Sequence, residues 1–412
     1  MNVFGPADIL LPRVDSLEKW SVIACDQFTS QPEYWQRVRA CVGDAPSTLR
    51  LVLPEAELGA NNDERAAQIN AEMKRLLDGG LFSVYANAMI YVERTLLDGH
   101  VRKGLVGAVD LEAYDYETGS VSPVRASEKT VVERIPPRKK VRECAPLELP
   151  HVLLLCDDDE RVLIEPIAAV RESLPKLYEF DLMEGGGHIA GWLVQGETAE
   201  AFERRLAAYA RTVDGKYEGL NGASVLFAVG DGNHSLATAK ACYEDQKRAC
   251  GPEEAAKLPS RWALVELENI HDEAQAFEPI HRLVLTEDAN ALLRRMREKI
   301  GAETGYPVTW YAGEKSGVIY LDERQGPLPV GVLQAFLDAY MTEHPCEIDF
   351  IHGEDALREL AARDGAVGLA LPAIDKGGLF RGIVADGVLP RKSFSMGHAR
   401  EKRYYLEARR IR

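Results

Sequence analysis

The stretch "VLFAVGDGNHSLATAKACYEDQK", residues 225–247, changes character in its middle. Its first five residues are apolar and predict a short buried strand, and its last twelve have the apolar spacing of a helix. Between them stand Gly230, Asp231, Gly232, Asn233 and His234. One interpretation is structural: the glycines adopt backbone angles closed to other residues, and Asn233 or Ser235 caps the helix. The other is functional: backbone N–H groups at the helix start bind an anion, on which Asp231 and His234 act.

The size of the chain predicts two structural units. It has 412 residues, of which 46% are hydrophobic, and a single core stops growing at roughly 250–300 residues. A second series of alternating elements starts near Thr286. We therefore expect a main domain over residues 1–285, to which residues 390–412 return, and a smaller α/β domain over residues 286–389.

The order of elements predicts a mixed α/β fold with much antiparallel pairing. Asp98 and Gly99 separate two long strand-like segments, as in a hairpin. Residues 21–25 and 48–54 read as strands, residues 161–174 as a helix, and residues 183–194 as part of a hairpin.

Composition also restricts location and partners. No run reaches the roughly 18 apolar residues of a membrane helix, and the first twenty residues do not resemble a signal peptide. The seven cysteines form no C-x-x-C pair, which favours free thiols in a reducing cytoplasm. We expect a cytoplasmic protein without a membrane partner.

The formal net charge of −16 repels polyanions, so nucleic acid is not an expected partner. Two local stretches, residues 134–142 and 398–412, are nevertheless basic. They either attract a small anionic substrate or form an ordinary solvated surface.

The common catalytic signatures are absent from the sequence: there is no phosphate loop of the G-x-x-x-x-G-K-[ST] type, no H-E-x-x-H and no G-x-S-x-G. The acidic run "LCDDDE", residues 155–160, suggests either a metal cluster or, more typically, a solvated turn. His188 and His398 follow glycines, and His234 shares a glycine-flanked turn with Asp231.

Several segments in order resemble one family over nearly the whole chain. These are "VIACDQFTSQPEYW", "RASEKTVVERIPPR", "GGGH", "GDGNHSLATAK", "ENIHDEAQAFEPIHR", "FIHGED" and "LPRKSFSMGHAREKRYYLE". The chain resembles the bacterial and archaeal family called domain of unknown function 1015. That family's turn, usually Asp-Gly-His-His-Arg, is similar to the phosphate-binding turn of the ParB and sulfiredoxin fold, which includes kinases of free serine. The resemblance implies a ParB/sulfiredoxin-like core.

Two positions of this turn depart from the family pattern. Asn233 stands for the first His, and Ser235 stands for the Arg. Losing the Arg removes a bidentate phosphate clamp. Lys240, Arg391 and Lys402 are the basic residues that we consider as its replacement.

Together the residues and the resemblance predict a small-molecule phosphotransferase. It would use a nucleotide or pyrophosphate to phosphorylate serine or a similar hydroxylated metabolite, with Mg²⁺ as cofactor. Phosphoryl transfer needs mainly positioning and charge neutralisation. We predict Asp231 as the Mg²⁺ ligand, His234 as a phosphate contact and Glu128 as base or orienting group. The predicted phosphate-binding residues are Gly230, Gly232, Asn233 and Ser235, and the predicted pocket residues are His188, Arg134, Ser395 and His398.

Two other classes remain open from the sequence. The same anion site would suit a hydrolase of a phosphorylated metabolite, or a noncatalytic sensor of an anionic metabolite. The oligomeric state is not encoded in any pattern that we find.

Overall fold

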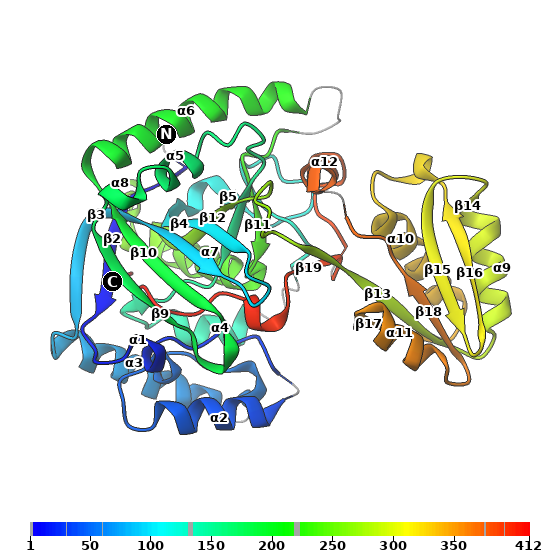
Figure 1. Cartoon of the computed structure of the whole chain (residues 1–412), viewed down its shortest axis with the longest axis horizontal. Helices are drawn as coiled ribbons and strands as arrows, with labels where there is room; N and C mark the ends of the chain where they lie inside the picture. The colour runs from blue at the N-terminus through cyan, green and yellow to red at the C-terminus, as the bar shows by residue number, and fades with distance from the viewer. Residues whose placement is uncertain are drawn as a thin grey trace.

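The computed structural model describes residues 3–29, 31–59, 61–130, 135–217, 223–374, 376–390 and 392–412. Within these residues two large sheets are present (Figure 1). An eleven-stranded sheet has the order β5-β6-β11-β8-β12-β4-β3-β10-β9, with β1 added to β4 and β2 to β3. A seven-stranded sheet has the order β14-β16-β15-β18-β13-β17, with β19 added to β13.

The strands of the larger sheet are β1 (Phe4–Gly5), β2 (Ala7–Pro12), β3 (Phe82–Thr95), β4 (Val101–Asp110), β5 (Tyr114–Asp115), β6 (Val124–Ala126), β8 (Leu153–Cys156), β9 (Lys176–Asp181), β10 (His188–Val194), β11 (Phe227–Asp231) and β12 (Trp262–Asn269). Those of the smaller sheet are β13 (Phe277–Thr286), β14 (Gly301–Ala302), β15 (Tyr306–Ala312), β16 (Lys315–Leu321), β17 (Cys346–His352), β18 (Ala366–Ala370) and β19 (Phe394–Met396). A separate short pair joins β7 (Leu147–Glu148) to β20 (Arg409–Arg410).

The helices of the described residues are α1 (Leu17–Trp20), α2 (Pro32–Val42), α3 (Asn62–Asp78), α4 (Ile135–Arg142), α5 (Glu165–Ala168), α6 (Gly196–Lys216), α7 (Asn233–Arg248), α8 (Pro252–Ala255), α9 (Ala289–Ile300), α10 (Pro329–Glu343), α11 (Glu354–Ala361) and α12 (Lys376–Asp386). None of these described helices combines the length and the apolar content that a membrane span requires.

The larger sheet separates two hydrophobic cores. Along β3, Met89 and Tyr91 pack into one core, and Ile90 and Val92 pack into the other. This alternation follows from the two-residue period of a strand, which sends successive side chains to opposite faces. The first core includes apolar residues of α6 and α7. The second is built with α2, α3 and the C-terminal segment, residues 404–411.

The mixed α/β class with much antiparallel pairing is confirmed. Three pairs in the larger sheet are parallel, β5 with β6, β6 with β11, and β8 with β12. In the described residues of the smaller sheet, the strand pairs are all antiparallel. β13 pairs with β19 at its start and with β17 and β18 further on. Figure 1 shows this strand running out from the larger unit to the smaller sheet. The predicted domain boundary at residue 286 therefore falls at the end of β13. The division of the chain into a main domain and a smaller domain stays a prediction.

Several local expectations were wrong. Residues 21–25 form only an isolated bridge, between Ile23 and Tyr404. The 3-10 helix Thr48–Arg50 replaces the strand predicted over residues 48–54. The helix predicted over residues 161–174 is reduced to α5 and a 3-10 turn. The predicted hairpins at Asp98 and around the glycines at 185–187 are present, as β3–β4 and β9–β10.

Candidate functional site

The turn at residues 230–234 connects β11 directly to α7. Each of its two glycines is needed for a different steric reason. A Cβ on Gly230 would overlap Met396 and Leu155. Gly232 has φ +81° and ψ +26°, the left-handed region that glycine adopts at least cost. Gly232 is also the N-cap of α7, and its carbonyl accepts the N–H groups of Ser235 and Leu236.

The polar side chains of this turn do not cap the helix. Asp231 Oδ2 and Asn233 Oδ1 are both buried, and neither accepts a hydrogen bond from any described residue. Asn233 Nδ2 lies 3.4 Å from Ser127 Oγ. Ser235 Oγ lies 2.8 Å from His151 Nε2. Since buried polar atoms are nearly always hydrogen-bonded, two oxygens without such a bond at one helix start make this turn a candidate site.

Lys402 supplies positive charge at this turn. Its Nζ lies 3.6 Å from Asp231 Oδ2, which is close enough for ionic attraction but too far for a hydrogen bond. Lys240, another candidate for the missing Arg, instead donates to the carbonyl of Leu111 and pairs with Glu244. Arg391 lies outside the described residues. Of the described candidates, Lys402 is therefore the one that contacts the turn.

Glu128 approaches the turn from the neighbouring strand. β6 and β11 are parallel, with Ala126 opposite Val229, so the residues that follow both strands emerge at one edge of the sheet. The Glu128 carboxylate accepts the backbone N–H groups of Lys392 and Ser393, each at 2.9 Å. Burial raises the pKa of Glu128, although these hydrogen bonds act in the opposite direction. In the structure, Glu128 thus holds the backbone of Lys392 and Ser393 beside the turn.

The C-terminal segment, residues 392–411, is fixed against the turn by buried arginines. Arg94 donates to the carbonyls of Arg400 and Lys402, both at 2.7 Å, and Arg102 donates to that of Glu401 at 3.0 Å. Burial and the nearby charge of Arg102 lower the pKa of Arg94 to about 9. These contacts hold the backbone of Lys402, and so direct its ammonium group toward Asp231.

The smaller sheet also contributes a residue near the site. His352 ends β17. Burial lowers its pKa, and the positive charges of Lys392 and Lys402 lower it further. His352 was not predicted as a site residue, although it belongs to the "FIHGED" segment.

The remaining predicted pocket residues lie in different places. Ser395 is in β19, next to Met396, which contacts the turn, and its hydroxyl donates to the carbonyl of Gly397 at 3.0 Å. His398 is 72% exposed and lies 3.4 Å from Glu278. His188 lies at the other side of the sheet, in β10, where its Nδ1 is 2.7 Å from Asp181. The structure brings Ser395 close to the turn but gives His188 and His398 partners of their own. Arg134 lies outside the described residues.

His234 and three residues that the sequence did not identify complete the surroundings. His234 is the second residue of α7, and its carbonyl accepts the hydroxyl of Thr238. His151 touches the turn, since a Cβ on Gly232 would lie 3.5 Å from its ring. Tyr405 OH lies 3.2 Å from His151 Nδ1. Burial raises the pKa of Asp26, but nearby His151, Gln27, Lys402 and Arg138 outweigh it and lower the pKa overall. Asp26 lies in a family-like segment, whereas His151 lies in none.

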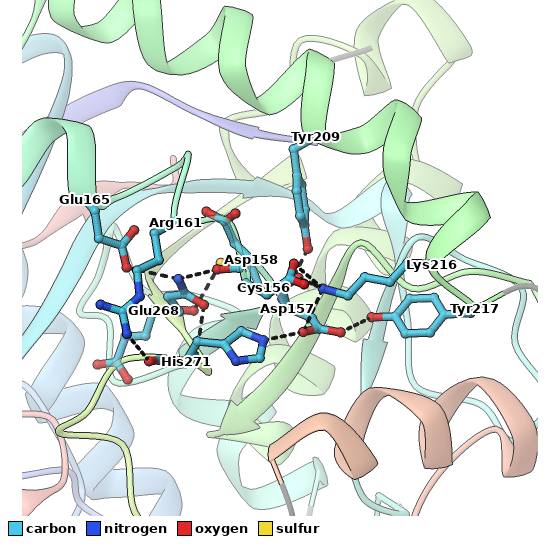
Figure 2. A network of polar contacts seen from close by, with 12 residues as sticks. Cys156, Asp157, Asp158, Arg161, Glu165, Tyr209, Lys216, Tyr217, Glu268 and His271 are labelled. Carbon is cyan, nitrogen blue, oxygen red and sulfur yellow. Dashed lines mark hydrogen bonds and ion pairs between the residues drawn. The ribbon is translucent and has the colours of Figure 1, made fainter.

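A second acidic cluster surrounds the run "CDDDE" (Figure 2). Lys216, Tyr217 and His271 all point toward the carboxylate of Asp157, at 3.0, 2.7 and 2.6 Å. The backbone N–H of Asp157 donates to Tyr209 OH at 3.2 Å. These contacts tie the loop after β8 to the end of α6.

The neighbouring aspartates are also engaged. Asp158 accepts the N–H of Leu163 at 2.8 Å, and Asp159 accepts Lys216 Nζ at 2.8 Å. No group of three or more potential metal ligands was found among the described residues. The hydrogen bonds give this run a structural role, but the expected solvated turn was wrong for Asp157 and Asp158, which are buried.

Comparison with known proteins places the chain in a family. A family model described as "Protein of unknown function (DUF1015)" matches residues 9–408. The chain belongs to the DUF1015 family. A search of curated proteins found no match to this DUF1015 chain.

Solved structures similar to this DUF1015 protein include C-terminally truncated SbnI from Staphylococcus aureus, at 12% identity and a TM-score of 0.37, covering 71% of this chain and 82% of that one. A free serine kinase in complex with AMP matches at 13% identity and a TM-score of 0.36, covering 73% and 92%. A conserved hypothetical protein from Pyrococcus furiosus matches at 12% identity and a TM-score of 0.33, covering 71% and 91%. Similarity at this level transfers no activity to this chain.

Proposed function

We propose that this protein is a phosphotransferase that acts on a small hydroxylated metabolite at the start of α7. One observation carries the proposal: Asp231 Oδ2 and Asn233 Oδ1 are buried without a hydrogen bond from any described residue, beside the ammonium group of Lys402. Acidic and amide oxygens, a lysine and a helix N-terminus are the groups that phosphoryl transfer employs.

The residues present suit a magnesium ion that is completed by its substrate. Mg²⁺ prefers oxygen ligands, and it is commonly held by one or two carboxylates together with substrate phosphates and water. Asp231 would hold the ion, and Asn233 would contribute its amide oxygen. When bound, Mg²⁺ would neutralise charge on the phosphates of a nucleotide or pyrophosphate donor.

The protein's own groups would have separate tasks. Lys402 would neutralise phosphate charge in place of the family's Arg, and the N-terminus of α7 would face the phosphate oxygens. His234 would contact the transferred group. Glu128 would act as base or orient the acceptor hydroxyl. The hydrogen bonds that the Glu128 carboxylate accepts from the backbone of Lys392 and Ser393 support the orienting role, because they fix this carboxylate beside the turn.

The test is a ³¹P NMR assay of the purified protein with Mg²⁺, a nucleotide or pyrophosphate donor, and serine or another hydroxy amino acid. The proposal predicts a phosphomonoester signal that requires protein, donor and acceptor. Release of inorganic phosphate without need of an acceptor would instead identify a hydrolase. Saturable binding of phosphate compounds without any turnover would identify a sensor.

A further inference from the structure

A cavity of about 160 Å³ lies beside the first turns of α7. Much of its wall is apolar and comes from segments far apart in the sequence, including Leu53, Met73, Val141, Leu236, Ala239 and Leu264. Protein interiors contain few voids larger than a water molecule. An apolar cavity of roughly 150 Å³ is large enough to bind a benzene-sized group.

One part of the cavity wall is polar and adjoins the candidate site. Ser235, His151 and Tyr405 line the cavity and form a chain of close contacts, with Ser235 Oγ to His151 Nε2 at 2.8 Å and His151 Nδ1 to Tyr405 OH at 3.2 Å. The same His151 ring packs against Gly232. The cavity and the N-cap of α7 therefore share His151 as a common wall.

Charged groups connect the two places as well. Arg138 lines the cavity and forms an ion pair with Glu55, which also lines it. Asp26 lies near enough to both Arg138 and Lys402 for each to act on its carboxylate. Lys402 in turn contacts Asp231. The cavity is thus next to the place where an anionic group would be bound.

We propose that this cavity binds the apolar group of the metabolite whose hydroxyl or phosphate reaches the start of α7. The substrate is then amphiphilic: a phosphate ester or alcohol that carries one phenyl ring or an alkyl group of similar size. This inference rests on the proposed function for the position of the polar end. The cavity itself is independent of that function.

The test compares three probes by isothermal titration calorimetry on the full chain with Mg²⁺: inorganic phosphate, phenyl phosphate and phenol. Burial of a phenyl-sized group should make phenyl phosphate bind about 10- to 100-fold more tightly than inorganic phosphate. Phenol alone should bind weakly at the same cavity. Ala239→Leu fills the cavity and should reduce the preference for phenyl phosphate to less than about threefold.

Ala241→Leu is the matched control, because Ala241 lies in the same helix but outside the cavity wall. It should keep the full preference for phenyl phosphate. If Ala239→Leu does not fold, as judged by circular dichroism, Leu53→Phe fills the cavity from another segment and is expected to give the same loss.

The outcomes separate the two proposals. If inorganic phosphate binds tightly and phenyl phosphate binds no more tightly, the cavity inference is overturned. The proposed function then still stands. Phenol and phenyl phosphate that bind in an Ala239-dependent manner, without any binding of inorganic phosphate, support the cavity and argue against the phosphotransferase. A failure of both phenyl compounds to bind overturns the cavity site.

Discussion

Asp231 and the acidic run at residues 157–160 lie at the two ends of β8, and they differ in how their oxygen atoms are satisfied. Asp231 pairs with Leu153 at the start of this strand, and Asp157 follows Cys156 at its end. Each carboxylate has a lysine nearby, Lys402 at 3.6 Å and Lys216 at 3.0 Å. Asp157 also receives hydrogen bonds from Tyr217 and His271, whereas Asp231 Oδ2 receives none from the described residues.

This difference separates structural acids from candidate functional ones. The run of three aspartates is the more conspicuous acidic feature of the sequence, yet its contacts fix a loop to α6. The single aspartate between two glycines has an oxygen that receives no hydrogen bond from the described residues. This contrast favours Asp231 over the acidic run as a candidate binding residue.

The largest effect is expected from Asp231→Asn. This change keeps the shape of the side chain but removes the charge that would hold Mg²⁺, so turnover should fall by roughly 10²–10³. The free energy of unfolding should fall by less than the roughly 2–3 kcal/mol expected below for Asp157→Asn, because Asp231 Oδ2 has no hydrogen bond to lose and its contact with Lys402, at 3.6 Å, is longer than those of Asp157. Initial rates and urea unfolding check both expectations.

The matched control for this variant is Asp159→Asn, which changes an aspartate of the other cluster. It should leave turnover intact. A variant at Asp231 that unfolds readily while turning over substrate normally would show that the turn has only a structural role.

Asp157→Asn should produce the opposite pattern. Removing this buried charge takes the carboxylate away from His271 and Lys216, although Lys216 keeps its ion pair with Asp159. We expect a loss of about 2–3 kcal/mol in the free energy of unfolding. Activity per folded molecule should be unchanged. Asp214→Asn, an exposed position on α6, serves as control and should cost less than about 0.5 kcal/mol. Equal stability of the two variants would remove the structural interpretation of the "CDDDE" loop.

Lys402→Met should weaken the affinity for inorganic phosphate about 10- to 150-fold, since a charge-assisted hydrogen bond contributes roughly 1.5–3 kcal/mol. Lys240→Met is the comparison, because Lys240 is bound to Leu111 and Glu244 instead of facing the turn. Calorimetric titration of both variants distinguishes them. The assignment of Lys402 fails if the two lysines prove equally important.

The smallest effect concerns pH and the acidic run at residues 157–160. The hydrogen bond and charge of Lys216 lower the pKa of Asp159 below its usual value of 3.8, against a smaller opposing effect of burial. A lowered pKa in the folded state adds stability above the unfolded value, and this stability is lost as pH falls through the folded value. Urea unfolding from pH 7 to pH 3 should show the difference between wild type and Asp159→Asn shrinking on the acid side. A difference that stays constant over this range would contradict the ion pair.

The sequence predicted the elements that have strong local signals. The helical spacing after the glycine turn became α7, and the Asp98–Gly99 pair became a hairpin. Residues 21–25 were misjudged because they are apolar for a different reason: Val22 and Ile23 are buried beneath the C-terminal segment and do not join the sheet. Residues 161–174 contain Pro166, and only a short helix forms there.

The candidate site was predictable only where the signal was local. Asp231 and Asn233 are marked by their flanking glycines, and Lys402 was one of three basic candidates. His151 carries no such mark, since its partners Ser235 and Tyr405 are 84 and 254 residues away in the chain. A contact of that separation depends on the register of the sheet, which local patterns do not determine.

The contacts that fix the C-terminal segment, residues 392–411, have a consequence for biosynthesis. Trp20 donates its indole N–H to the carbonyl of Leu406, a contact across 386 residues, and Lys402 reaches Asp231 only when this segment is in place. The turn at residues 230–234 leaves the ribosome well before Lys402 is added. A nascent chain would therefore carry Asp231 without its lysine, and this ion pair should form only late in synthesis. Contacts of such long range also slow folding.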